Sequence, residues 1–208
     1  MSSPVSNRIR FVRRFVSVWL LAGLGWGGLL FAAASAIAPA APQLVDLLGL
    51  RSTVPADWVA EEPQSDMRLA QFRVPADGGP EDAAMVVYYF GPSQGGTLEA
   101  NIARWQSQFT GPDGGPVEPE ITELDGTLPA TLVTLRGNYA RGVGVGPVGE
   151  ALPDRMLLAA IVQTSQGNLY PQLHGPAAVV EQARPAFVAF IQGLASASSA
   201  TEPASAGE

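Results

Sequence analysis

The sequence predicts an α+β domain in which an antiparallel sheet of about six to seven strands packs with two main helices. Two observations lead to this prediction. Short alternating or uniformly apolar segments separated by turn residues recur along the chain, as expected of strands. Only two segments have the spacing of an amphipathic helix, one in mid-chain and one near the end. The order of strands, helix, four strands and helix favours an α/β/α sandwich, preceded by an N-terminal apolar helix.

The expected strands differ in how they are buried. Residues 67–74 alternate, with Ala70, Phe72 and Val74 on one face. Residues 84–90 are apolar on both faces and rich in aromatic side chains, which indicates a central strand. Further strands are expected at 120–124, 131–139, 155–164 and 169–174, with the first two joined around Asp125-Gly126, a hairpin signal.

The two expected helices have clear signals. Thr97 is a suitable N-cap for the first. The second begins at Pro176, and Pro185 is expected to kink it or divide it in two. The apolar stripe of the first helix consists of Leu98, Ile102, Trp105 and Phe109, and that of the second of Val180, Ala183, Phe187, Phe190, Ile191 and Leu194.

Several short motifs resemble a known fold. Residues 54–195 open on Pro55-x-x-Trp58 and contain Met67-Arg-Leu-Ala-Gln-Phe-Arg, Tyr89-Phe-Gly-Pro, Gln94-Gly-Gly and Asn101-Ile-Ala-Arg-Trp. The chain thereby resembles the PsbP-like fold and an uncharacterised exported bacterial family with that fold. The PsbP-like group includes the extrinsic subunit of photosystem II. That function is not expected here, because a fold alone does not define an activity and no matching set of site residues is present.

The N-terminus predicts export. Residues 15–38 are an uncharged run of 24 residues, and four arginines precede it. Such a run is long enough to cross a bilayer core of about 30 Å, with the N-terminus in the cytoplasm. It is either an uncleaved signal anchor or a signal peptide, cleaved after Ala34-Ser-Ala or Ala38-Pro-Ala. Arg13-Arg14 leaves both the general secretory and the twin-arginine routes open.

These features divide the chain into four parts. Residues 1–38 are the signal peptide or transmembrane anchor, and 39–54 are a spacer with a possible helical turn at 44–48. Residues 55–195 are the globular domain, and 196–208 are a tail too poor in apolar residues to order itself. The expected location is the cell membrane, as a single-pass protein, or the periplasm or exterior if the segment is cleaved.

Composition excludes several chemistries. The chain has no cysteine and no lysine, which excludes disulfides, thiolate metal sites and Schiff bases. His174 is the single histidine, so a site with several histidine ligands is excluded and no cofactor is expected. Beyond the first four arginines, eight arginines against nineteen acidic residues leave a net charge of −11. Such a domain is not expected to bind nucleic acid.

Two patterns are better explained by loops than by sites. Residues 144–149 match the glycine pattern of a dinucleotide-binding loop, but Pro147 interrupts it and no helix is expected to follow. The loop of which they are part, 142–154, is long for a hairpin and is a place where binding is common. Carboxylates gather at 61–66, 77–82 and 118–125, beside turns and without calcium-loop spacing, which favours solvated charge.

The candidate binding residues are Tyr88, Tyr89, Arg104 and His174. Arg104 adjoins Trp105, whose place on the apolar stripe favours core packing, and is expected to cover the edge of the stripe or meet a carboxylate. His174 is expected to be a structural residue at a strand end, since no nucleophile motif accompanies it. We therefore expect a non-enzymatic extracytoplasmic domain that binds an envelope protein partner or a small ligand. The alternative is a hydrolase that uses carboxylates, or His174 with a serine.

Overall fold

The computed structural model describes residues 40–140 and 150–196. The predictions for the N-terminal segment, for residues 144–149 and for the tail beyond Ser196 lie outside these ranges. The chain divides into two units, residues 1–38 and residues 39–208, and all the described residues belong to the second. Within the described ranges, neither helix is long and apolar enough to cross a membrane.

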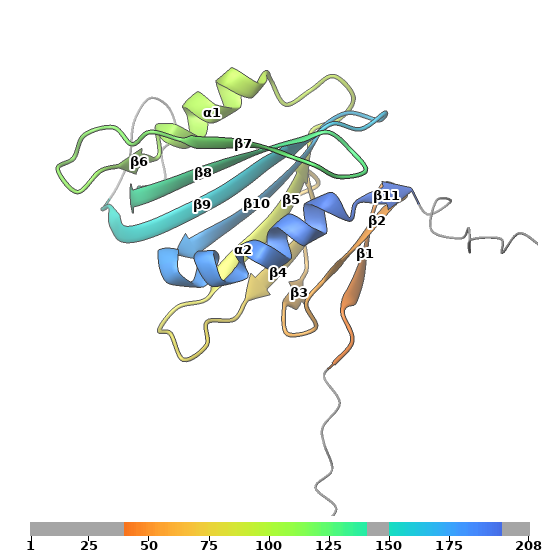
Figure 1. The fold of residues 1–208 in the computed structure, drawn as a ribbon, viewed down its shortest axis with the longest axis horizontal. Coiled ribbons are helices and arrows are strands. Elements are labelled where there is room, and N and C mark those ends of the chain that lie inside the picture. The colour runs from red at the N-terminus through yellow and green to blue at the C-terminus, as the bar shows by residue number, and fades with distance from the viewer. Residues whose placement is uncertain (1–39, 141–149, 197–208) are drawn as a thin grey trace, which may run out of the picture. The chain divides into compact units, whose positions relative to one another are not determined.

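Eight antiparallel strands form the main sheet (Figure 1). Their order is β3-β4-β5-β10-β9-β8-β6, and β7 also pairs with β8. The sheet is larger than predicted because two short edge strands, β3 and β6, extend it. The bounds are β3 Val59–Glu61, β4 Arg68–Val74, β5 Ala83–Tyr89, β6 Phe109–Thr110, β7 Glu120–Leu124, β8 Ala130–Tyr139, β9 Leu152–Val162 and β10 Leu169–Pro176.

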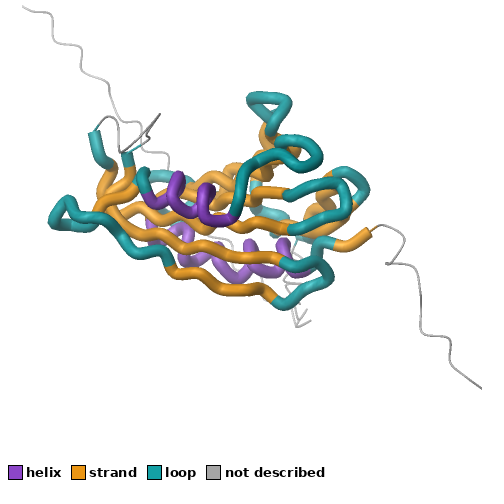
Figure 2. The backbone as a smooth tube through the Cα atoms, turned by 90° about the horizontal axis from the view of Figure 1, so that it is seen from above, coloured by secondary structure: helices purple, strands orange, loops and turns teal. Residues whose placement is uncertain are grey.

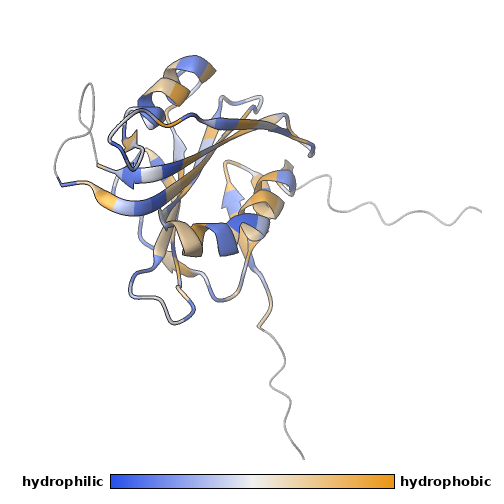
Figure 3. Ribbon diagram, turned by 60° about the vertical axis from the view of Figure 1, so that its left-hand side comes forward, coloured by the Kyte–Doolittle hydropathy of each residue, from blue (hydrophilic) through white to orange (hydrophobic). Residues whose placement is uncertain are grey.

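One helix lies on each face of this sheet (Figure 2). Helix α1 spans Leu98–Gln106 and helix α2 spans Ala177–Gln192. Because successive strand residues point to opposite faces, each central strand contributes to two cores. The larger core lies under α2 and includes Met85, Leu158 and Phe187; the smaller lies under α1 and includes Trp105, Leu157 and Tyr170. Both helices carry hydrophilic and hydrophobic residues, as expected of helices that bury one side (Figure 3).

A second sheet of three strands corrects the prediction for residues 39–54. Strands β1 (Gln43–Leu47) and β2 (Leu50–Val54) form where a spacer and a helical turn were expected. The third strand, β11 (Ala195–Ser196), pairs with β2 and includes Ser196, the first residue of the predicted tail. Val45 and Leu47 lie on one face and are buried, which is strand periodicity. Leu48 and Gly49 both have positive φ, at 56° and 82°, and close a two-residue hairpin turn.

The helices agree with the prediction in part. Thr97 is the N-cap of α1, and its hydroxyl accepts a hydrogen bond from the amide of Ala100. Phe109 lies beyond the helix, in β6. Pro185 does not divide α2, which is assigned as one helix. The carbonyl that Pro185 leaves without an intrahelical partner is that of Glu181; both residues are exposed, so water can satisfy it.

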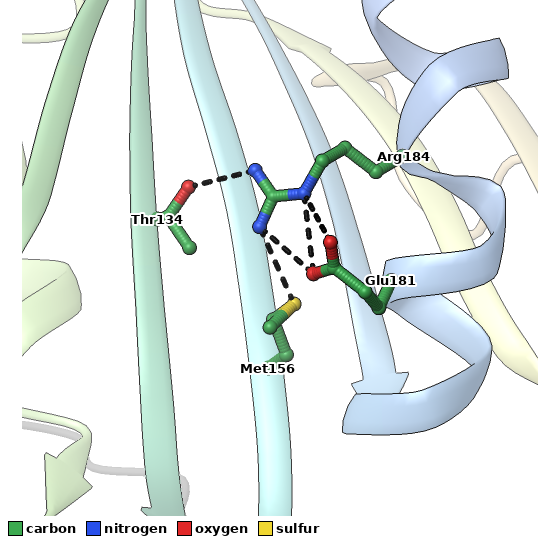
Figure 4. A network of polar contacts seen from close by, with 4 residues as sticks. All are labelled: Thr134, Met156, Glu181 and Arg184. Atoms are coloured by element: carbon green, nitrogen blue, oxygen red, sulfur yellow. Dashed lines mark hydrogen bonds and ion pairs between the residues drawn. The ribbon is translucent and has the colours of Figure 1, made fainter.

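The Arg184 side chain of helix α2 contacts two strands of the main sheet (Figure 4). Its guanidinium donates to the Thr134 hydroxyl at 3.2 Å and lies 3.9 Å from the Met156 sulfur. The same group is paired with Glu181 one turn earlier, at 3.0 Å. Arg184 therefore connects α2 to β8 and β9 while its charge stays compensated.

Candidate functional site

Helix α1 has only nine residues and covers part of its face of the sheet. Beside it, over β4, β5 and β10, lies a cleft of about 520 Å³, a size typical of small-molecule sites. We call it the α1 cleft. Its lining residues are Gln64, Arg68, Gln71, Ala84, Val86, Tyr88, Phe90, Arg104, Trp105, Gln108, Tyr139, Leu157, Gln172 and His174.

The floor of the α1 cleft follows from strand periodicity. Alternate residues of β5, namely Ala84, Val86 and Tyr88, point to the α1 side. On the neighbouring strand β10, Gln172 pairs with Val86 and His174 pairs with Ala84. The polar residues Gln172 and His174 therefore lie on the same face as the small apolar residues of β5.

A β-bulge brings Arg68 to the cleft. The register between β4 and β5 pairs Arg68 with Tyr88 but Ala70 with Val87, so one extra residue lies between them. Without the bulge, Arg68 and Gln71 would face opposite sides of the sheet because they are three residues apart. With it, Arg68 donates a hydrogen bond to the Gln71 side chain at 2.7 Å.

The Arg68 guanidinium is held by neutral groups. Its Nη1 donates to Gln71 and, at 3.2 Å, to Gln64. Its central carbon lies 5.5 Å from the centroid of the Tyr88 ring, within cation–π range. The Tyr88 and Phe90 rings are nearly parallel, at 2°, with centroids 6.1 Å apart. Arg68 thus lies beside a pair of parallel aromatic rings.

Arg104 is fixed from its own helix. Its Nη2 donates to the Oδ1 atom of Asn101 at 2.6 Å. Asn101 is buried and donates in turn to the carbonyls of Gly95 and Thr97, both at 2.8 Å. The turn before α1 therefore positions Asn101, and Asn101 positions Arg104.

The two cleft arginines differ from the other arginines in their charge partners. Within residues 40–140 and 150–196, Arg68 and Arg104 form no ion pair with a carboxylate. The other arginines of these ranges all do: Arg51, Arg73, Arg136, Arg155 and Arg184. No aspartate or glutamate is among the described residues that line the cleft. An acidic domain thus presents two uncompensated cations in one concave site.

Two glutamines add neutral polar groups. Gln108 and Gln172 are half-buried in the cleft lining. In the part of the chain that the structure describes, their side-chain amides form no hydrogen bond. A primary amide can donate and accept. The cleft can therefore recognise a polar substituent in addition to a negative charge.

Three of the four residues singled out from the sequence, Tyr88, Arg104 and His174, meet in the α1 cleft. Tyr89 lies on the opposite face, packs against the α2 core, and donates from its hydroxyl to the carbonyl of Gln166 at 2.7 Å. Trp105 is buried, as its place on the apolar stripe predicts, and one part of it lines the cleft.

Sequence reasoning missed Arg68, Gln108 and Gln172. Gln172 could have been found from its position in the sequence. It is a polar residue two positions before His174 in a buried strand, which puts both side chains on one face. Gln108 follows Arg104 by four residues, but α1 ends at Gln106, so helical spacing does not account for its place in the cleft. Nothing in the sequence indicates the bulge that turns Arg68 toward the cleft.

The carboxylates close to cleft-lining residues have partners. Glu61 accepts a hydrogen bond from the lining residue Gln71 at 2.8 Å and lies 3.8 Å from Arg73. Glu81 accepts two hydrogen bonds from Arg155, at 2.7 and 2.6 Å, which hold its pKa below the ordinary value. The amide of Ala76, followed by Arg73, lowers the pKa of Asp82 in the same way. No serine is among the described residues that line the cleft. No group of three or more metal-ligating side chains occurs in the described ranges.

The class of the fold is α+β, mostly sheet with two helices. Neither a family model nor a curated protein matches the sequence. Several solved structures are similar, among them the following two. Protein PA94 of unknown function, from Pseudomonas aeruginosa, is 20% identical over 75% of this chain and 97% of its own, with a TM-score of 0.43. Cyanobacterial PsbP (CyanoP) from Synechocystis sp. PCC 6803 is 14% identical over 80% of this chain and 98% of its own, with a TM-score of 0.45.

The match to the cyanobacterial protein agrees with the PsbP-like resemblance that the sequence motifs indicate. At these identities the likeness concerns the fold and extends to no activity, ligand or partner.

Proposed function

We propose that the chain is a non-enzymatic binding domain that takes a small organic anion in the α1 cleft. The observation that carries this proposal is the pair Arg68 and Arg104, two cations without a carboxylate partner in the described residues, in a cleft with no acidic lining. A bound carboxylate, sulfonate or phosphate would supply the missing charge. The aromatic surface of Tyr88 and Phe90 favours a ligand with an apolar or aromatic body.

The concave shape favours a small molecule over a protein partner. Protein interfaces are broad, whereas a cleft of about 520 Å³ has the volume of a small-ligand site. The net negative charge of the domain also affects where an anion can bind. An acidic domain repels anions in general, so an anion gains most where local cations outweigh that repulsion.

We further propose that this domain acts outside the cytoplasm, held by residues 15–38 as a single-pass anchor or released by cleavage. The support is the sequence pattern of four arginines followed by 24 uncharged residues. Mass spectrometry of the mature N-terminus, together with membrane fractionation, tests this. An intact N-terminus in the membrane fraction indicates the anchor, a start near Ile37 or Ala41 in the soluble fraction indicates cleavage, and an intact soluble protein contradicts both.

The binding proposal is tested with anilinonaphthalene sulfonate, an aromatic anion whose fluorescence rises in an apolar site. The measurement uses residues 39–208, the compact unit that contains the whole described core. We expect saturable binding to the native unit, checked by cooperative thermal unfolding. The Arg104→Gln variant should weaken binding about three- to tenfold, because it removes one charged donor at a solvent-accessible site.

The matched control is Arg136→Gln. Arg136 lies on β8, is paired with Asp154, and does not line the α1 cleft. Its replacement makes the same change in net charge, so we expect affinity to stay within about twofold. Equal effects of the two variants would show that the dye responds to total charge and would contradict the proposed site.

A further inference from the structure

A second cleft continues the first. It has a volume of about 230 Å³ and shares Ala84, Tyr139 and His174 with the α1 cleft. We call it the Met156 cleft. Its other lining residues are Glu81, Asp82, Phe109, Leu152, Arg155, Met156 and Gly175. The two clefts therefore meet near the start of β5 and the end of β10, where Ala84 pairs with His174.

The two clefts differ in their charges. In the α1 cleft, Arg68 and Arg104 have no carboxylate partner among the described residues. Among the described residues that line the Met156 cleft, the one arginine is Arg155, which donates two hydrogen bonds to Glu81. Asp82 is likewise bound to Arg73. The rest of that lining is chiefly apolar, with side chains from Phe109 and Leu152. The Met156 side chain points to the opposite face, where its sulfur lies 3.9 Å from Arg184, so Met156 contributes main chain to this cleft.

The strand geometry gives the distance between the proposed anion site at Arg68 and the junction of the two clefts at Ala84. Arg68 pairs with Tyr88, and Tyr88 is four positions after Ala84 along β5. At about 3.3 Å per residue, that separation is about 13 Å. A ligand that pairs with Arg68 and also enters the Met156 cleft must therefore be elongated, and must pass over Val86 and Ala84.

We infer that the ligand is an amphipathic monoanion, whose acidic group pairs with Arg68 and Arg104 and whose uncharged apolar tail passes Ala84 into the Met156 cleft. This inference rests on the proposed function, since it takes the α1 cleft as the anion site. To that proposal it adds that the ligand is elongated and carries its charge at one end only. A second negative charge at the far end is disfavoured, because it would lie in an apolar lining beside Glu81 and Asp82.

The experiment compares three probes by isothermal titration calorimetry on residues 39–208, each below its micelle concentration. Octanoate is a short monoanion, dodecanoate a long one, and dodecanedioate a long molecule with a second terminal carboxylate. We expect dodecanoate to bind roughly tenfold or more tightly than octanoate, because four further methylenes leave water. We expect dodecanedioate to bind at least about tenfold more weakly than dodecanoate. The full chain in lipid nanodiscs, with empty nanodiscs subtracted, should give the same ranking.

Two variants locate the tail. Ala84→Leu fills the junction between the clefts, and should remove the advantage of dodecanoate while octanoate still binds. Leu152→Ser removes apolar contact from the far cleft at a residue that is 45% exposed, so it puts little of the core at risk. It should reduce the advantage of dodecanoate without changing octanoate affinity.

The outcomes separate the two proposals. If octanoate and dodecanoate bind equally, or dodecanedioate binds best, the amphipathic-ligand inference is wrong although the anion site stands. The same holds if neither variant changes the preference for dodecanoate. If no carboxylate binds, and Arg104→Gln does not alter binding of anilinonaphthalene sulfonate, the proposed function itself fails.

Discussion

The guanidinium carbon of Arg68 lies 5.5 Å from the centre of the Tyr88 ring, on the strand next to it. This contact and the hydrogen bond to Gln71 hold the cation in the α1 cleft without neutralising it. A cation in this state keeps its attraction for an anionic ligand and loses little side-chain freedom when the ligand binds.

Replacing the Tyr88 ring should therefore weaken anion binding. Tyr88→Leu removes the cation–π contact and the aromatic surface, and we expect the affinity for anilinonaphthalene sulfonate to fall about two- to fivefold. Tyr88→Phe keeps the ring and is the matched control, with affinity expected within about twofold. A fluorescence titration of both variants measures this. Equal losses in the two variants would assign the effect to the hydroxyl group instead.

The turn before α1 depends on the absence of a side chain at Gly95. This residue has φ of +97°, and a Cβ there would overlap the hydroxyl and ring of the buried Tyr170. We expect Gly95→Ala to reduce the free energy of unfolding by about 2–4 kcal/mol, through backbone strain and overpacking together. Urea denaturation provides the measurement.

Gly96→Ala is the control for backbone strain alone. Gly96 also has positive φ, at +80°, but its nearest neighbour to a new Cβ is the Asn101 side-chain nitrogen at 3.7 Å, an ordinary contact. We expect a loss of only about 1 kcal/mol. If Gly95→Ala reduces the free energy of unfolding by no more than Gly96→Ala does, the result contradicts the close approach of Tyr170 to Gly95.

The β1–β2 hairpin can be tested by a stabilising change. Leu48 has φ of 56° in the two-residue turn, where asparagine is favoured over leucine. We expect Leu48→Asn to increase the free energy of unfolding by about 0.5–1 kcal/mol, measured by urea denaturation. Leu44→Asn, at a strand position that is 65% exposed, should bring no gain. A spacer or helical turn at residues 44–48 would give Leu48→Asn no advantage.

The ion pair between Glu81 and Arg155 gives the domain a pH dependence. The hydrogen bond from Arg155 lowers the pKa of Glu81 in the folded state. A lowered pKa contributes stability at pH values above the unfolded-state pKa of glutamate, about 4.3, and this contribution is lost as the pH falls through the folded-state pKa. Because the Glu81 side chain is 53% exposed, we expect a modest effect.

Glu81→Gln should therefore lower the thermal unfolding temperature at neutral pH and make it less dependent on pH below about 4.3. Glu120→Gln is the control, because Glu120 is exposed on β7 and forms no ion pair within the described residues. An acid transition that is the same in Glu81→Gln and in the parent protein would contradict the role of this pair.

The main elements of the fold could be predicted because their periodicity is strong. The alternation around Phe72, the apolar run before Phe90 and the stripe that contains Trp105 correspond to β4, β5 and α1. The β1–β2 hairpin could not be recognised, because its turn is Leu48-Gly49 and leucine is not a turn residue. Its short strands also include an exposed leucine, Leu44, and a buried polar residue, Ser52, which weakens their apolar alternation.

The candidate site could be predicted only in part, for a similar reason. Strict alternation places Arg68 on the same face as Phe72, in the α2 core, and the bulge beside Leu69 reverses this. The bulge depends on the pairing with β5, which is a tertiary feature. His174 and Arg104 could be singled out as unusual residues, but their meeting in one cleft follows from the packing of α1 on the sheet.

The central claim is that the α1 cleft binds an organic anion, and the side-chain amides of Gln108 and Gln172 test it most directly. Both residues line the cleft, and neither side-chain amide forms a hydrogen bond among the described residues. Their NH₂ signals in nitrogen–proton correlation NMR therefore report on a ligand bound in the cleft. On titration of residues 39–208 with anilinonaphthalene sulfonate, we predict that both signals shift along one saturation curve, with the Kd found by fluorescence. Shifts confined to other residues, such as the loops at 93–97 and 164–168, with Gln108 and Gln172 unmoved at saturation, would contradict the account.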